Sequence, residues 1–263
     1  MNSAHQIERL GQAALDAVQI PLRMAQAGRS MAELALCGAA RLEPWRHYPA
    51  GDARDREHGT QFYFHAHELP RGADEHGHFH LFLRDVDPGG FRHLIALAID
   101  SVGRPLRWFS TNEWVTGEAL VGAATLSPVL HDFSLRRRGR LAPLARWLRA
   151  LVRLYADEIE QVLRERDARL QHEASIRPLP SVLQDRQLDV LSQFEIDLPQ
   201  RIQALYLEPP TVEGNCHEAG FEIVIAGPVG AAVGRLESGR LAAARPRGRQ
   251  RLVGRPSRRG ADL

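Results

Sequence analysis

Cysteine is scarce in this chain, whose 263 residues include only Cys37 and Cys216. Two cysteines are too few for a disulfide-stapled scaffold of this size. No run of about 18 apolar residues occurs, so we expect no membrane-spanning helix. The first ten residues are polar and charged, and no apolar stretch with a small-residue cleavage site follows them, which predicts the absence of a secretory signal. These absences favour a cytoplasmic protein of bacterial type without a membrane partner.

Lysine is absent, so arginine carries all 34 basic charges, against 32 acidic residues. From Ala226 to Leu263 the chain holds nine arginines and two acidic residues, a net charge of +7, which leaves −5 for the remainder. The basic character is therefore a property of the tail and does not indicate a nucleic-acid-binding body. We expect nucleic acid to make only non-specific, salt-sensitive contacts with the arginine-rich tail.

Glycine-rich phosphate loops of the Walker and dinucleotide types are also missing. Hydrophobic residues make up 44% and charged residues 25% of the chain, which is the ordinary composition of a globular protein. We predict a single domain over residues 1–208. Residues 209–263 are rich in Gly, Ala, Arg and Pro and keep little core-forming periodicity, so we predict a disordered basic tail there.

The periodicity of apolar residues predicts an α+β fold with N-terminal helices, a central antiparallel sheet of about four strands, and C-terminal helices. Short turns join the four expected strands, which favours a meander because parallel strands need long crossovers. Residues 43–59 are expected to form an ordered loop. Residues 3–42 and 143–172 are expected to be helical, and residues 185–207 helical or mixed.

Histidine is concentrated in the strand region, which holds seven of the twelve histidines: His58, His65, His67, His76, His78, His80 and His93. Alternate side chains of a strand share a face, so His65 and His67 project together. His76, His78 and His80 do the same if their strand begins that early. A hairpin of the two strands would bring up to four imidazoles to one face, with apolar residues packed beneath them.

Neutral imidazole is the commonest protein ligand of transition metals. We therefore predict that His65, His67, His78 and His80 hold a divalent transition metal, with zinc or iron preferred. Glu75 and His76 are the candidate catalytic residues, since a carboxylate at this turn can bind the metal, orient a ligand or act as a general base. In an enzyme, the metal would activate water or dioxygen, or polarise an oxygen of a small-molecule substrate.

A metal-free alternative comes from His76-Gly-His-Phe-His-Leu-Phe82, which is similar to the alternating-histidine motif of histidine-triad nucleotide hydrolases and transferases. The resemblance implies that the central histidine, His78, attacks a phosphate. Gly77 stands where that family has a hydrophobic residue, and the helix and glycine-rich segment that precede the motif are missing.

A cupin-like pattern overlaps the same region. Gly59-Thr-Gln-Phe-Tyr-Phe-His65-Ala-His67 resembles the opening of the first cupin motif, and Pro88-Gly-Gly90-Phe-Arg-His93 resembles part of the second. That resemblance implies His65, His67 and His93 as metal ligands, completed by a carboxylate. The glutamate expected a few residues after His67 is absent, and too few strands are predicted for a double-sheet barrel.

Five blocks together resemble a bacterial family known as a domain of unknown function. They are Trp45-Arg-His-Tyr-Pro49, Gly51-Asp52, Gln61-Phe-Tyr-Phe-His-Ala-His67, Glu75-His-Gly-His-Phe-His-Leu-Phe-Leu-Arg84 and Thr111-Asn-Glu-Trp-Val-Thr-Gly-Glu118. The resemblance covers about residues 5 to 207 and implies a single domain, without an activity or a catalytic residue to carry over. A third hypothesis stays open beside the metal site and the histidine-triad enzyme: a non-catalytic binding or scaffold domain with a polar or pH-responsive histidine network.

Overall fold

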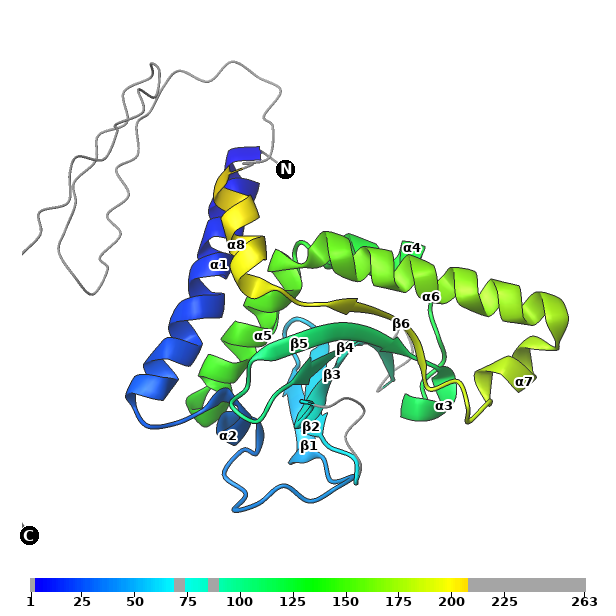
Figure 1. The fold of residues 1–263 in the computed structure, drawn as a ribbon, viewed down its shortest axis with the longest axis horizontal. Coiled ribbons are helices and arrows are strands. Elements are labelled where there is room, and N and C mark those ends of the chain that lie inside the picture. The colour runs from blue at the N-terminus through cyan, green and yellow to red at the C-terminus, as the bar shows by residue number, and fades with distance from the viewer. Residues whose placement is uncertain (1–2, 69–73, 85–89, 208–263) are drawn as a thin grey trace, which may run out of the picture. The chain divides into compact units, whose positions relative to one another are not determined.

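The computed structural model describes residues 3–68, 74–84 and 90–207. Contacts divide the chain into two units, Met1–Val212 and Glu213–Leu263, and all described residues belong to the first. The tail predicted from residue 209 lies outside the described residues. Helices packed against an antiparallel sheet confirm the predicted α+β class (Figure 1).

The sheet has six strands in the order β1-β2-β3-β4-β5-β6, and every neighbouring pair is antiparallel. The meander is therefore confirmed, whereas the expected number of about four strands was too low. The strands are β1 (Tyr48–Asp55), β2 (Thr60–His65), β3 (Gly77–Arg84), β4 (Phe91–Ile99), β5 (Pro105–Thr111) and β6 (Val190–Glu195). The four expected strands are β2 to β5.

The two additional strands, β1 and β6, are the edges of the sheet. The segment of β1 was expected to be a loop because it contains proline, glycine and charged residues. The strand is irregular in the way this composition suggests: Tyr48-Pro49 is a cis peptide, Asp52 has a φ of 51°, and the register shifts between Tyr48 and Ala53. Such residues are tolerated at an edge, where half of the backbone groups need no strand partner.

Two helical regions flank the sheet in sequence. The first contains α1 (Ser3–Gln26), which runs through Pro21, and α2 (Met31–Ala35). The region expected to be one helix from Pro143 consists of α5 (Ala142–Leu154) and α6 (Ala156–Ile176), which meet at Tyr155. Shorter helices are α3 (Glu113–Thr116), α4 (Ala123–Leu126), α7 (Leu179–Leu183) and α8 (Leu198–Leu207). Among the described helices, none is long and apolar enough to cross a bilayer.

The main core lies between α5 and one face of the sheet. Phe62, Phe79 and Trp108 from that face are fully buried and belong to one apolar cluster with Trp147 of α5. The ring centroids of Phe79 and Trp147 lie 6.3 Å apart. The opposite face of the sheet is also covered, because every residue of β2 is buried. Polar side chains on that second face are therefore removed from water.

Candidate metal centre

Strand register brings the predicted histidines of β2 and β3 together. His65 pairs with His78, and Tyr63 pairs with His80, on the face opposite the main core. Gly77 makes the close approach possible at this end of the hairpin: a Cβ there would lie 2.5 Å from the Phe64 ring and 2.7 Å from the His65 carbonyl oxygen. A side chain at position 77 would therefore push apart the two strand ends that carry His65 and His78.

His65, His78 and His80 form a compact buried triad. Each offers one ring nitrogen, and these three atoms all lie within 4.8 Å of one another. The Nε2 atoms of His65 and His78 are 2.8 Å apart. The ring centroid of His80 lies 5.2 Å from that of His65 and 4.9 Å from that of His78. A single ion could reach all three nitrogens after small side-chain rotations.

Glu75 fixes the orientation of the His78 ring. Its Oε1 lies 2.7 Å from His78 Nδ1, and its Oε2 accepts a hydrogen bond from the Arg107 guanidinium. Burial alone would raise the pKa of Glu75, but the hydrogen bond and charge of His78, together with Arg107, hold it below its usual range. The carboxylate can only accept hydrogen bonds, so His78 Nδ1 donates to it. In a neutral His78, the lone pair is then on Nε2, which faces His65.

A β-bulge brings His93 to the same face. In the β3–β4 ladder Leu81 pairs with Ile95 and Phe82 pairs with His93, so Leu94 is the extra residue. Strict alternation from Ala96 would place Leu94 on the histidine face and His93 in the main core. The bulge reverses this assignment: Leu94 joins the core cluster, and His93 Nε2 lies 2.9 Å from His80 Nδ1. Bulges often redirect a side chain in this way beside a functional site.

His93 is neutral and links the triad to Thr111. Complete burial, with the charges of Arg166 and His78, lowers its pKa to about 3. Thr111 Oγ1 lies 3.5 Å from His93 Nδ1. One consistent assignment of protons has His93 Nδ1 donating to Thr111 and His80 Nδ1 donating to His93 Nε2, which gives His80 a lone pair on Nε2. Glu75 thus favours Nε2 as the ligand atom of His78, and with this proton assignment His93 favours Nε2 as the ligand atom of His80.

The remaining predicted residues lie around the triad. The His67 ring centroid is 5.1 Å from that of His65 and 5.1 Å from that of His78, and the ring packs against Trp45. His76 precedes β3, and its ring stacks on Phe64 at 6.5 Å, so it does not join the face that carries His78 and His80. His76 and Glu75 instead line a cleft of about 960 Å³.

The charges of Asp52 and of Glu118, in the segment Trp114 to Glu118, affect Tyr63 on the histidine face. Burial, and then the charges of Glu118 and Asp52, raise the pKa of Tyr63. Burial, opposed in part by a hydrogen bond from Thr116, raises the pKa of Glu118. The Tyr63 ring stacks at 3.7 Å on His47, whose centroid is 5.7 Å from that of His65. Asp52 Oδ1 lies 3.2 Å from His47 Nδ1, so an acidic side chain borders the rings next to the histidine cluster.

Comparison with protein families identifies the origin of these motifs. Residues 11–196 match a family described as a domain of unknown function, DUF6969. The chain belongs to the DUF6969 family. Searches of curated proteins and of solved structures gave no match. The predicted resemblance to a family of unknown function is thus confirmed, and the matched residues of this DUF6969 domain include the whole histidine cluster.

Two partners in the DUF6969 site were not predicted from sequence. Arg107 was not considered, although a charged residue between Leu106 and Trp108 in an otherwise apolar strand is a signal that it has a buried partner. His93 was considered only through the cupin-like pattern, as a metal ligand. The structure places it as the hydrogen-bond partner of His80, because the bulge at Leu94 cannot be read from alternation.

Proposed function

We propose that this DUF6969 protein binds one divalent transition metal ion, zinc or iron, through His65, His78 and His80. The observation that supports the proposal is the buried triad, whose three ring nitrogens lie within 4.8 Å of one another. A tetrahedral ion with bonds of about 2.0–2.1 Å needs its ligand nitrogens about 3.3 Å apart. The 2.8 Å between His65 and His78 Nε2 therefore has to open by only about half an ångström.

The surroundings of the triad support the same proposal. Metal-bound histidine usually donates the N–H of its second ring nitrogen to a carboxylate or another acceptor. This hydrogen bond fixes the ring orientation and makes the ligand nitrogen more basic. Glu75 does this for His78, and His93 offers an acceptor to His80. Three histidines in one buried group also suit these ions, because zinc and iron accept imidazole readily.

His67 determines whether the proposed site is closed or open. Four protein ligands are typical of structural zinc, whereas three ligands and an exchangeable position are typical of catalytic zinc. The nitrogens of His65, His78 and His80 form the compact group, and the His67 ring packs beside it against Trp45. We propose the open arrangement, in which a bound metal would supply Lewis acidity to a small molecule.

The test is elemental analysis of the full chain, purified without a polyhistidine tag and reconstituted with zinc or iron(II). We expect about one equivalent of metal in the wild type, and loss of that equivalent in His65→Gln/His78→Gln, which keeps hydrogen-bonding groups in the buried site. The control His5→Gln/His172→Gln removes two exposed histidines and should retain the metal. His67→Ala should also retain it if three ligands suffice.

A thermal measurement provides an independent readout. A ligand at about 100 times its Kd stabilises the folded state by about 2.7 kcal/mol. For a domain of some 200 residues, this raises the melting midpoint by about 5–10 °C. Folded wild-type protein that takes up no metal and shows no shift would refute the proposal. The hydrogen-bonded chain from Glu75 to His65 would then support the non-catalytic polar network as the function of these histidines.

A further inference from the structure

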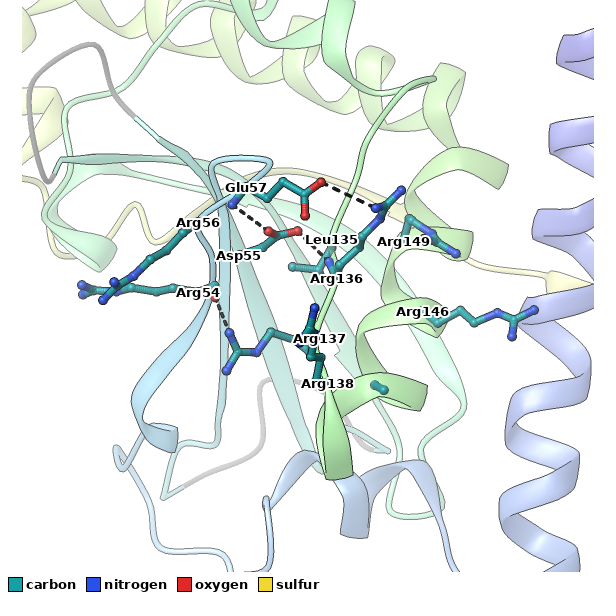
Figure 2. A pocket seen from close by; sticks show the side chains of 11 residues that line it. Arg54, Asp55, Arg56, Glu57, Leu135, Arg136, Arg137, Arg138, Arg146 and Arg149 are labelled. Atoms are coloured by element: carbon teal, nitrogen blue, oxygen red, sulfur yellow. Dashed lines mark hydrogen bonds and ion pairs between the residues drawn. The ribbon is translucent and has the colours of Figure 1, made fainter.

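An arginine-rich cleft lies away from the histidines, at the other end of β2. The cleft has a volume of about 810 Å³, and Figure 2 shows the side chains that surround it. Its arginines come from three segments: Arg54 and Arg56 at the end of β1, Arg136 to Arg138 before α5, and Arg146 and Arg149 on α5. Arg54 pairs with Gln61 near the start of β2, whereas His65 is the last residue of that strand.

Hydrogen bonds between side chains and backbone groups hold two of these segments side by side. Asp55 Oδ2 accepts from the backbone N–H of Arg136 at 2.8 Å, and Thr60 Oγ1 donates to the carbonyl of Ser134 at 2.8 Å. The guanidinium of Arg137 donates to the carbonyl of Arg54 (Figure 2). The buried Asp55 carboxylate thus joins the segments by accepting from a backbone N–H group, and it does not pair with the guanidinium groups of the cleft. The arginines are gathered by the fold of the backbone and not by ion pairing.

Positive charge in the cleft exceeds negative charge. Seven arginines and two carboxylates, Asp55 and Glu57, line it, which is an excess of five. Outside the lining residues, Asp16 holds Arg146 in a bidentate ion pair at 2.7 and 2.6 Å. Within the cleft, Glu57 approaches Arg136 at 3.7 Å, and both side chains are exposed. Exposed pairs of this kind contribute little, so several positive charges remain available to an anion.

The first turn of α5 adds to this attraction. Ala142, its first residue, lines the cleft. The residue before it, Leu141, has no side-chain oxygen and provides no capping hydrogen bond. A 3-10 turn, Gly139–Leu141, leads into the helix; its Gly139 carbonyl accepts the N–H of Ala142, and residue 143 is proline. The N-terminus of this 13-residue helix therefore contributes through its partial positive charge. An anion in the cleft would therefore meet the positive end of this helix as well as guanidinium groups.

We propose that this cleft binds a small anion made of several linked phosphates, such as a polyphosphate or the phosphate chain of a metabolite. The volume is in the range of small-molecule sites. Guanidinium groups match phosphate oxygens in pairs, and seven arginines line this cleft. The lining residues include no tryptophan, tyrosine or phenylalanine, so bases would find no stacking partner, which disfavours single-stranded nucleic acid.

The test uses tripolyphosphate as the probe and isothermal titration calorimetry of the full chain in about 150 mM NaCl, at which long-range attraction is screened beyond about 8 Å. The variant Arg136→Gln/Arg138→Gln removes two exposed cleft charges. Its control, Arg29→Gln/Arg164→Gln, removes the same charge from exposed positions outside the cleft. The arginine-rich tail is present in all three proteins, so differences among them report on the cleft alone.

We expect one-to-one binding of tripolyphosphate by the wild type, unchanged affinity in the control, and affinity at least about tenfold weaker in the cleft variant. Circular dichroism melts establish that both variants are folded. Absence of binding, or equal losses in the two variants, would overturn the proposal. Tighter binding of a single-stranded RNA or of anionic vesicles, lost in the same cleft variant, would also overturn it by identifying a macromolecular ligand.

Discussion

Replacing Glu75 by glutamine changes one carboxylate oxygen into an amide and tests the arrangement behind the triad. The side chain is 3% exposed, and that of its partner Arg107 is 11% exposed. Glutamine keeps the shape but offers one acceptor in place of two, so either His78 or Arg107 loses its partner. Removal of one partner from a buried ion pair costs about 3–5 kcal/mol. Because glutamine retains one hydrogen bond, we expect a loss near the lower end, about 3 kcal/mol.

Metal affinity should fall in the same variant. Partners that orient a metal-bound histidine typically contribute a factor of about 10–100 in affinity, which corresponds to about 1.4–2.7 kcal/mol. Stability is measured on the metal-free protein by urea unfolding, followed through the fluorescence of the buried Trp108 and Trp147. Affinity is measured by competition with a chromophoric zinc chelator, under conditions in which both proteins are folded.

The control for Glu75→Gln is Asp100→Asn. Asp100 also accepts from an arginine, Arg104, but this arginine side chain is 80% exposed, and the carboxylate mainly receives the backbone N–H groups of the β4–β5 turn. We expect a cost of about 1–2 kcal/mol in stability and unchanged metal affinity. Wild-type affinity in Glu75→Gln, with a stability change below about 0.5 kcal/mol, would refute the reasoning about both partners of Glu75.

Two further predictions concern the scaffold. Burial would raise the pKa of Asp55, but the N–H groups of Arg136 and His58 and the His58 side chain lower it. The ionised Asp55 carboxylate therefore stabilises the folded state near neutral pH, and this contribution is lost as the pH falls below the ordinary pKa of 3.8. Asp55→Asn should therefore cost about 1–2 kcal/mol at pH 7 and much less near pH 3, and an equal cost at both values in thermal unfolding would contradict the assignment. Gly77→Ala should cost about 1–3 kcal/mol through its clash with Phe64, and a Phe64→Leu background should recover part of this loss; additive effects in urea unfolding would argue against the contact.

The sequence could predict the middle of the sheet and the core of the site because both depend on a local period of two. β2 and β3 alternate between apolar residues for the core and a second set for the other face, which includes His65, His78 and His80. The register that pairs His65 with His78 follows once the hairpin forms. The edge strands were harder to predict from the sequence. The edge strand β1 carries proline, glycine and charged residues that resemble a loop, and β6 mixes apolar and polar residues that resemble a helix face.

Contacts between residues far apart in the sequence also could not be predicted. Glu75 and Arg107 are 32 positions apart. Their pairing depends on the registers of the β3–β4 and β4–β5 ladders, and each ladder contains a shift that alternation does not reveal. His93 was obscured for a different reason, since the bulge changes which side of β4 it occupies. The cleft of arginines illustrates the same point: the run from Arg136 to Arg138 is visible in the sequence, but its proximity to Arg54 is a product of tertiary structure.

The bulge at Leu94 makes the length of β4 as important to the histidine cluster as its composition. Deletion of this single residue would restore regular pairing with His93 still opposite Phe82 on the histidine face, whereas regular pairing with Leu94 present would turn His93 into the apolar core and leave His80 facing a different neighbour. Relatives that keep the cluster should therefore either retain the extra residue together with its bulge or lack both, even though the strand contains none of the three proposed ligands. An alignment of DUF6969 sequences would show whether the number of residues in this strand is conserved. Substitution patterns alone would show only another apolar strand.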